Sequence, residues 1–320
     1  MESYRKLKFF YFLTFFLILN YLITSFRFNL TENLIAFFYL ARIIIYFLYG
    51  IFLSYWTKKN KHNFNLSSLI LKLSLLVIFF SLAQYLLYPD LRNLRYLGWD
   101  EHLYRMFGLF FDTSVAGAIY GLFFLYFYYL KKINNKFQLV FLFLFLTAIV
   151  LTFSRLTYIG ILITTLIDLS LRKKIKFIFL FLLTFALILI LAPKPFGEGV
   201  NLKRQFSIIS RLNDYRAAFN IWKKYPIFGI GYNRIGFYKP IDGLFPSHSN
   251  FSFSSSYLII LVCGGIVGFF LFLSGLLKLF FQEKNSRIYL FFIYFLSFFD
   301  NIILHPFVIF LLILFLINNS

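Results

Sequence analysis

Arginines at four positions are the residues best suited to chemistry. Arg155 lies in the tight turn TFSRLTYIG between two apolar runs, and Arg211 and Arg216 lie in a long polar segment further along the chain. A guanidinium group presents a planar fork of N–H donors that matches phosphate oxygens. Arg42 lies inside the apolar run 34–56, where a charged side chain costs at least about 2.5 kcal/mol and indicates a function. These arginines are therefore candidate ligands of a phosphate group.

Each arginine also has a purely structural interpretation. Arg42 could extend to the membrane surface or pair with a carboxylate such as Asp112, and Arg155 could anchor its turn at the membrane boundary. Arg211 and Arg216 are five residues apart and do not share a helix face well. One of them could face a ligand while the other faces lipid phosphates, which attract basic residues without any specific site.

His248, in FPSHSNFSFSSSYL, is the candidate proton acceptor. A neutral imidazole can take a proton from a hydroxyl group, and Asp242 and Asp300 are rival bases. The histidines show no HExxH spacing, and the single cysteine, Cys263, excludes a disulfide framework and a cysteine-based zinc cluster. The chain has no P-loop, no GxGxxG and no GxSxG. The sequence therefore predicts neither a metal nor a cofactor.

The composition determines the surroundings in which these residues must work. Hydrophobic residues make up 61% of the 320 residues and charged residues only 14%, against about 25% in ordinary globular proteins. No soluble core hides that much apolar surface, so we predict an all-α integral membrane protein. The net charge of +20 is explained by membrane topology, because the basic residues cluster between apolar runs, and nucleic acid is not an expected partner.

Apolar runs predict about ten transmembrane helices, since a crossing needs about 20 residues. The run 288–317 is long enough for two short helices with a break at Asn301, His305 and Pro306. The first run is followed by Arg27 rather than by a cleavage site, so we expect a retained anchor. The predicted single spans are 8–26, 34–56, 67–88, 109–130, 137–153, 156–171, 175–192 and 257–281.

Basic residues set the predicted orientation. With the N-terminus in the cytoplasm, the inner clusters at 5–8, 58–61, 131–136, 172–176 and 278–287 hold 16 lysines and arginines. The short outer loops hold only Arg27, Arg92, Arg95, Arg105 and Arg155. This asymmetry predicts that both termini are cytoplasmic.

Residues 1–320 are expected to form one polytopic membrane domain. Residues 193–256 would then be a large extracytoplasmic loop between spans seven and eight. Within it, DYRAAFNIWKK (214–224) has helical spacing, with Tyr215, Ala218, Phe219 and Trp222 on one stripe and a helix end at Pro226. We predict a basic amphipathic helix lying on the outer membrane surface.

Four segments taken in order resemble one family. They are FGLFFDTSVAGAIYGLFF (107–124), LTFSRLTYIGILI (151–163), SRLNDYRAAFNIWKKYPIFGIGYNRIG (210–236) and SSSYLIILVCGGIVGFFLF (254–272). They are similar to segments of the bacterial O-antigen ligases and O-antigen polymerases. The resemblance covers roughly residues 105–275, with the long loop in the family's place.

This resemblance implies a metal-independent, inverting glycosyltransferase with a GT-C-like fold of the bacterial inner membrane. Its donor would be an undecaprenyl-diphosphate-linked oligosaccharide, bound on the periplasmic face. By motif, Arg155 would bind the diphosphate, and Arg211 would be the arginine of the active site, with Arg216 nearby. The ligases have a His-Asn pair where this chain has Ser254 and Ser255. This difference favours a polymerase, in which His248 could still supply the catalytic base after a shift of the loop.

Other functions stay open at the level of the sequence. A ligase would transfer the glycan to lipid A-core or another acceptor. A lipid or solute transporter would show repeat symmetry and ionisable pairs near the midplane, and only Arg42 fits that pattern. A membrane scaffold would need neither Arg42 nor Arg155. For a polymerase, the expected partners are membrane lipids, a flippase and a chain-length regulator.

Overall fold

The computed structural model describes residues 2–60, 65–97, 102–129, 135–195, 198–239 and 248–318. Within these ranges the chain is helical, and its β-structure amounts to one isolated bridge between Asp90 and Leu103. The α-helices are α1 (Glu2–Ser25), α2 (Leu30–Lys59), α3 (Leu66–Leu87), α4 (Thr113–Tyr129), α5 (Asn135–Leu151), α6 (Arg155–Leu171), α7 (Ile175–Leu191), α8 (Phe206–Lys224), α9 (Ser256–Gln282), α10 (Arg287–Ser297) and α11 (Pro306–Asn318). The 3-10 helices are η1 (Arg92–Leu97), η2 (Gly108–Phe110), η3 (Glu198–Val200), η4 (Ile235–Phe237), η5 (His248–Phe251) and η6 (Lys284–Ser286).

Polar residues with short side chains start several of these helices. The Asn29 side chain accepts a hydrogen bond from the Glu32 backbone, and the Glu32 side chain accepts one from the Asn29 backbone, which forms a capping box for α2. Ser154 caps α6 and Ser255 caps α9 in the same way, each accepting from a backbone N–H three residues on. The starts of α6 and α9 are therefore fixed by local sequence.

The exposed surface of the helices identifies a membrane protein. Three helices, α2, α3 and α9, are long and apolar enough to cross a membrane. The most apolar stretch of α2 is only 17% buried, and leucine and phenylalanine side chains cover its outer surface. Exposing this apolar surface to water would be unfavourable, whereas contact with lipid is favourable. Shorter apolar helices, among them α4, α7 and α11, extend the same apolar body.

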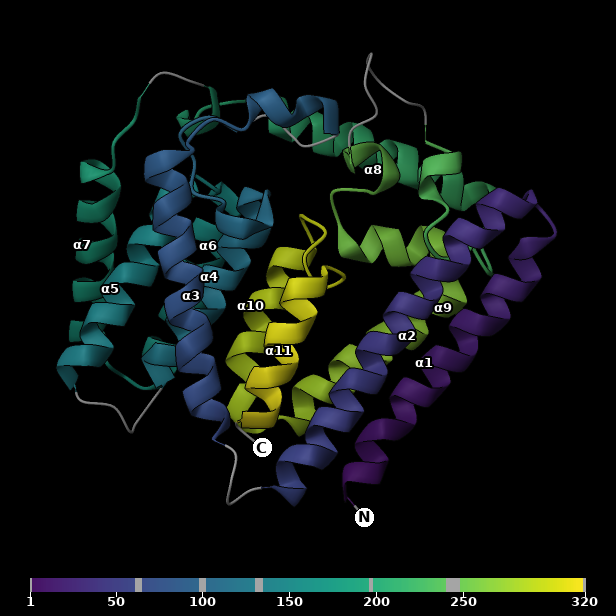
Figure 1. The fold of residues 1–320 in the computed structure, drawn as a ribbon, viewed down its shortest axis with the longest axis horizontal. Helices are drawn as coiled ribbons and strands as arrows, with labels where there is room; N and C mark the ends of the chain where they lie inside the picture. The colour runs from purple at the N-terminus through teal and green to yellow at the C-terminus, as the bar shows by residue number, and fades with distance from the viewer. Residues whose placement is uncertain are drawn as a thin grey trace.

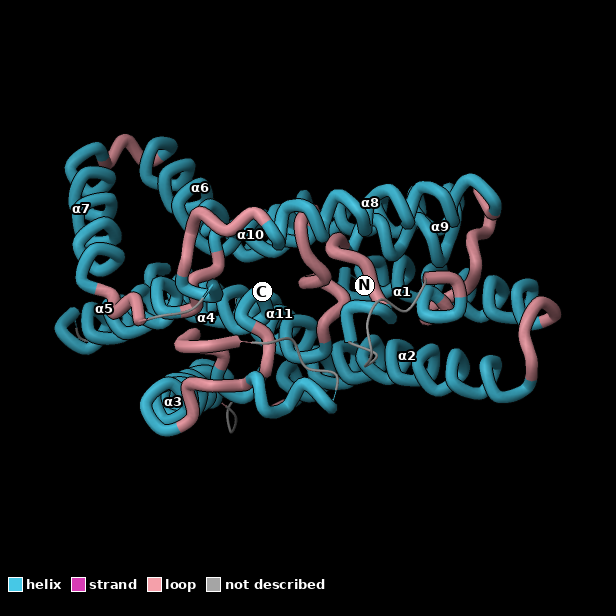
Figure 2. The backbone as a smooth tube through the Cα atoms, turned by 90° about the horizontal axis from the view of Figure 1, so that it is seen from above, coloured by secondary structure: helices cyan, strands magenta, loops and turns pink. Residues whose placement is uncertain are grey.

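The helices form two groups joined by α10 and α11. Helices α3 to α7 make one group, and α1, α2 and α9 make the other (Figure 1). Helix α10 packs on α4, α6 and α9, and α11 packs on α2 and α4. Both chain termini lie at one end of the molecule, and α8 crosses the opposite end (Figure 1). The view turned by 90° shows α8 running beside α9, on which it packs (Figure 2).

Glycines allow the central helices to approach closely. A Cβ atom at Gly121 of α4 would meet the ring of Phe292, and one at Gly160 of α6 would meet the side chain of Leu296. Both of these partners are fully buried residues of α10. Gly160 is the glycine that closes the segment SRLTYIG. The glycine thus brings α10, and the connection that follows it, close to the start of α6.

Helix α9 is broken at Gly265, whose φ of 62° and ψ of −166° are not helical. The break frees two backbone carbonyls and two N–H groups, which the segment PIFGIG (226–231) pairs. The four hydrogen bonds are Ile230 N to Val262 O (3.0 Å), Gly231 N to Cys263 O (2.9 Å), Ile266 N to Pro226 O (2.8 Å) and Val267 N to Ile227 O (3.3 Å). An irregular backbone inside an apolar body requires such pairing. This joint therefore fixes the end of α8 against α9.

The predicted break in 288–317 is confirmed, since α10 ends at Ser297 and α11 begins at Pro306. Helix α8 ends at Lys224, just before Pro226 as predicted, but it starts eight residues earlier than Asp214, at Phe206. The expected apolar stripe is partly wrong, because Phe219 is 45% exposed and Ile221 is buried instead. The pairing of Asp214 described below turns a different face of α8 towards α9.

Candidate functional site

The turn between α5 and α6 carries Arg155 in a constrained backbone. Phe153 has a φ of 49°, a left-handed conformation that costs a residue with a side chain about 1–2 kcal/mol, and its ring is fully buried. Ser154 then caps α6, and its Oγ also accepts a hydrogen bond from Thr157 Oγ1 (3.0 Å). Arg155 is the first residue of α6. Its guanidinium is therefore held at the positive end of the helix dipole, where anions bind favourably.

Two further arginines bind the carbonyl groups of this turn. Arg105 Nε donates to Thr152 O (2.8 Å), and Arg204 Nη2 donates to Phe153 O (3.0 Å). These carbonyls lie at the C-terminal end of α5, which carries the negative end of its dipole and attracts cations. Arg105 comes from the connection between α3 and α4, and Arg204 from the loop before α8. Segments that are far apart in sequence thus converge on one turn.

Helix α8 brings Arg211 to the same place. Arg155 donates to Leu202 O (3.1 Å) and to Ser207 Oγ (2.7 Å) at the start of α8. Arg211 is four residues after Ser207 and lies on the same helix face, one turn further along. Its Nη2 pairs with Asp300 Oδ2 at 3.3 Å, from the connection between α10 and α11. We call Arg105, Arg155, Arg204 and Arg211 the arginine cluster.

The arginine cluster carries an excess of positive charge. Among the described residues, Asp112 attracts Arg105 and Asp300 pairs with Arg211, so the four cations of the cluster face two acidic partners. Burial, and next the positive charge of Arg204, lower the pKa of Arg105 to about 9. Burial, followed by repulsion from Arg155 and Arg211, lowers the pKa of Arg204 as well. The cluster is therefore charged at neutral pH and would be stabilised by an anion.

Asp214 anchors α8 to the segments that lead into α9. It is 9% exposed, and its carboxylate accepts hydrogen bonds from Lys239 Nζ (2.6 Å), Ser254 Oγ (2.6 Å) and Ser254 N (3.0 Å). Ser255, the next residue, caps α9 and donates from its Oγ to Ser297 O (3.3 Å). Both serines therefore hold α8, α9 and the end of α10 together.

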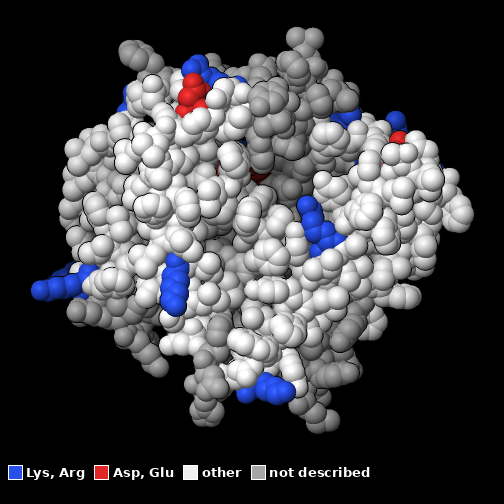
Figure 3. Space-filling view, in the orientation of Figure 1, with Lys and Arg blue, Asp and Glu red and all other residues white. Residues whose placement is uncertain are grey.

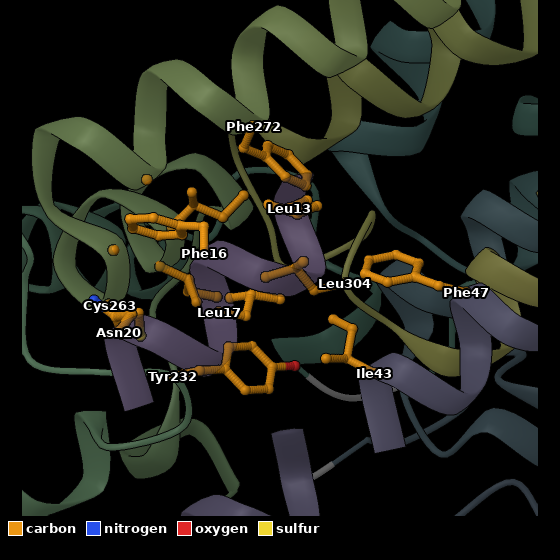
Figure 4. Close-up of a pocket in the computed structure, with 14 residues that line it drawn as sticks. Leu13, Phe16, Leu17, Asn20, Ile43, Phe47, Tyr232, Cys263, Phe272 and Leu304 are labelled. Atoms are coloured by element: carbon orange, nitrogen blue, oxygen red, sulfur yellow. The ribbon is translucent and has the colours of Figure 1, made fainter. Parts of the chain in front are cut away.

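A second set of polar groups lies beside the group formed by α1, α2 and α9. Arg42 of α2 stacks on the Tyr39 ring at 4.3 Å and hydrogen-bonds Tyr232, from the loop after α8. Tyr232 lines an apolar pocket together with Ile43 and Leu304, residues adjacent to Arg42 and His305. Figure 4 shows the Tyr232 hydroxyl directed towards Ile43 of α2. Arg42 and Asp300 both lie within electrostatic reach of His305.

The molecular surface is hollowed between the two groups. Figure 3 shows a depression near the centre of the face seen in Figure 1, with a basic side chain at its rim and acidic atoms at its depth. In the described part of the chain, no group of three His, Cys, Asp or Glu residues is arranged to hold a metal ion.

The structure places Arg155 against the start of α8, one turn before Arg211, and that these two arginines bind a phosphate group stays a prediction. Arg216 is exposed on α8, and its part in binding stays a prediction. Asp242 and the side chain of His248 lie outside the described residues, and η5 includes only the backbone of His248. Pattern analysis treated Arg105 as one of several outer-loop cations and did not single out Arg204. In the sequence, the one indication of a role for Arg105 or Arg204 is that each lies a few residues before a segment that resembles the family.

Residues 140–273 match a family model described as O-antigen ligase. This segment of the chain is similar to an O-antigen ligase domain. The domain runs from α5 through most of α9, so it contains Arg155, Arg204 and Arg211, whereas Arg105 and Asp300 lie outside it. It supports a function of the O-antigen ligase or polymerase type in a membrane protein, with a lipid-linked glycan as substrate. No curated protein and no solved structure gave a significant match to the chain.

Proposed function

We propose that this protein is a surface-polysaccharide polymerase of the O-antigen type. It transfers a glycan from undecaprenyl diphosphate to a lipid-linked glycan acceptor. The observation that carries the proposal is the arginine cluster, which gathers an excess of positive charge beside α8 in a membrane protein with an O-antigen ligase family domain. The leaving group of such a transfer is a lipid diphosphate, whose negative charge grows as the sugar departs.

Arg155 and Arg211 bind this diphosphate and stabilise the leaving group, so both are catalytic in this proposal. Preorganised cations that meet a developing charge typically contribute about 3 kcal/mol each to the rate. Arg216 and Arg42 are assigned to the same anionic substrate, Arg216 from the exposed side of α8 and Arg42 from α2. The arginines take the part that a divalent metal plays in other transferases, so the reaction is metal-independent. Direct attack by the acceptor hydroxyl inverts the anomeric centre.

The proposed setting is the inner membrane of a bacterium. Residues 1–320 form one polytopic domain in which ten helices, α1 to α7 and α9 to α11, cross the membrane. Both termini are cytoplasmic and the site is periplasmic. The same-end position of the termini, opposite α8, supports this orientation (Figure 1). The loop of residues 193–256 then supplies α8 and Arg211 from the periplasmic side.

Ser254 and Ser255 favour a polymerase over a ligase. They stand where the resemblance places the His-Asn pair of the ligases, and they act in structure, Ser254 on Asp214 and Ser255 as the cap of α9. His248 is the base that the sequence alone suggests, with Asp242 and Asp300 as its rivals. A ligase that transfers the glycan to lipid A-core is the second candidate, favoured by the description of the matching family. The lipid or solute transporter is the candidate of another class.

The test uses the purified protein in lipid nanodiscs with a defined undecaprenyl-diphosphate oligosaccharide. A polymerase gives a ladder of products that grows on the lipid carrier. Transfer to lipid A-core, with no ladder, identifies a ligase. Loss of the donor from one side of a sealed vesicle without any glycan transfer indicates a transporter and refutes the proposal. A flippase and a chain-length regulator are its proposed partners in the cell.

A further inference from the structure

His305 lies within electrostatic reach of Arg42 and of Asp300, the partner of Arg211 in the arginine cluster. It ends the connection between α10 and α11, and its carbonyl accepts the first hydrogen bond of α11, from Ile309 N at 3.0 Å. Pro306 follows as the first helical residue. Leu304, its neighbour in the chain, lines the apolar pocket between α1, α2 and α9 (Figure 4). The connection that carries the imidazole therefore borders the group formed by α1, α2 and α9.

Two charged groups, Arg42 and Asp300, act on His305, and each has a further polar partner. Arg42 comes from α2, and Tyr232, which Arg42 hydrogen-bonds, comes from the loop after α8. Asp300 comes from the same connection as His305 and pairs with Arg211 of α8. Asp300 thus acts on the ring of His305 and also pairs with Arg211, which the proposed function assigns to the diphosphate.

The imidazole is held in the form of a free base. Its Nδ1 atom is buried and has no hydrogen-bond partner in the described structure, an arrangement that is unfavourable for a polar atom. Burial, and next the positive charge of Arg42, lower the pKa of His305 to about 4, so the ring is neutral at pH 7. His305 as a whole is partly exposed, and because Nδ1 is enclosed, Nε2 is the ring nitrogen that remains to accept a proton.

We infer, on the basis of the proposed function, that His305 receives the proton of the acceptor hydroxyl during glycosyl transfer. The O–H bond breaks and its proton goes to Nε2, while the oxygen forms a bond to the anomeric carbon. The bond from that carbon to the diphosphate breaks, and its electron pair leaves with the diphosphate, which the arginine cluster binds. The imidazolium then releases its proton to water. Atoms and charge balance without any further reactant.

Donor binding prepares this base. The bound diphosphate brings negative charge next to Arg211 and offsets the repulsion from Arg42, so the pKa of His305 rises. A base works best when its pKa is near the operating pH. The histidine is therefore a weak base in the empty enzyme and a stronger one once the donor is in place.

The experiment compares His305→Gln with His248→Ala and with the matched control His62→Ala, all in nanodiscs. In the sequence His62 follows α2 and precedes α3, and the end of α2 and the start of α3 lie opposite α8 (Figure 1). Single-turnover transfer is measured together with equilibrium binding of the lipid-linked donor. For His305→Gln we expect transfer to slow by about 100-fold or more with donor binding unchanged. For His62→Ala we expect the wild-type rate and wild-type binding.

A His305→Gln enzyme that transfers at the wild-type rate overturns the inference, and so does a loss of transfer in His248→Ala alone. If His305→Gln does not fold, the pH dependence of transfer by the wild-type enzyme tests the inference instead. The acid limb of kcat reports the enzyme with its substrate and should lie at higher pH than that of kcat/KM. A kcat limb at or below that of kcat/KM overturns the inference. Wild-type protein that transfers no glycan refutes the proposed function, and this assignment with it.

Discussion

Replacing Arg155 by alanine tests the proposed diphosphate site most directly. The change removes a cation at the start of α6 and two hydrogen bonds, to Leu202 O at 3.1 Å and to Ser207 Oγ at 2.7 Å. Each bond is partly exposed and contributes about 1 kcal/mol, so the fold should survive. Loss of a contact that strengthens in the transition state should cost about 3 kcal/mol, or a rate reduction of more than 100-fold.

Replacing Arg211 by alanine should be at least as damaging. It removes a cation and also leaves the Asp300 carboxylate, its partner at 3.3 Å, without a counter-charge. That carboxylate would then repel the incoming diphosphate. Arg155→Lys and Arg211→Lys should restore part of the activity, because an ammonium group keeps the charge but lacks the planar fork.

The assay is transfer from an undecaprenyl-diphosphate oligosaccharide, with melting temperature as a check on folding. Lys223→Ala and Lys224→Ala are the controls, since both lysines are exposed in the last turn of α8. We expect them to keep nearly full activity at low salt, as their attraction to the membrane surface is not specific. If the two arginine variants stay fully active while the lysine variants lose transfer, the site has been placed on the wrong part of α8.

Three further predictions follow from the same reasoning. Product formation should persist in EDTA, because arginines stabilise the leaving group, and activity that is lost and then restored by Mg²⁺ or Mn²⁺ would contradict this. A reporter fused at residue 134 should be cytoplasmic and one at residue 240 extracytoplasmic, and a cytoplasmic signal at 240 would reverse the topology. Gly265→Ala should destabilise the protein by at least about 2 kcal/mol, because only glycine tolerates its backbone conformation and a Cβ would meet the Ile227 carbonyl. Ser274→Ala, at an exposed position of α9, should melt like the wild type, and equal melting of both variants would show that the break in α9 is dispensable.

Local sequence was sufficient to predict the helices and the kind of chemistry. Apolar runs require lipid, so the membrane class follows from composition alone. The break before Pro306 and the end of α8 before Pro226 were predictable because proline cannot continue a helix. Arg155 could be singled out because its turn is too short to place it anywhere but near the end of two helices.

Only the tertiary structure decided which charges meet. Arg105, Arg204 and Asp300 come from three different connections, and no spacing rule relates residues that are about 50 to 200 positions apart. The buried face of α8 also escaped prediction, because the pairing of Asp214 with Lys239 and Ser254 outweighs its apolar periodicity. The sequence marked His305 only as part of a helix break, whereas the folded chain buries its Nδ1 and places Arg42 and Asp300 near its ring. Periodicity and composition act over a few residues, whereas a charged site is formed by long-range contacts.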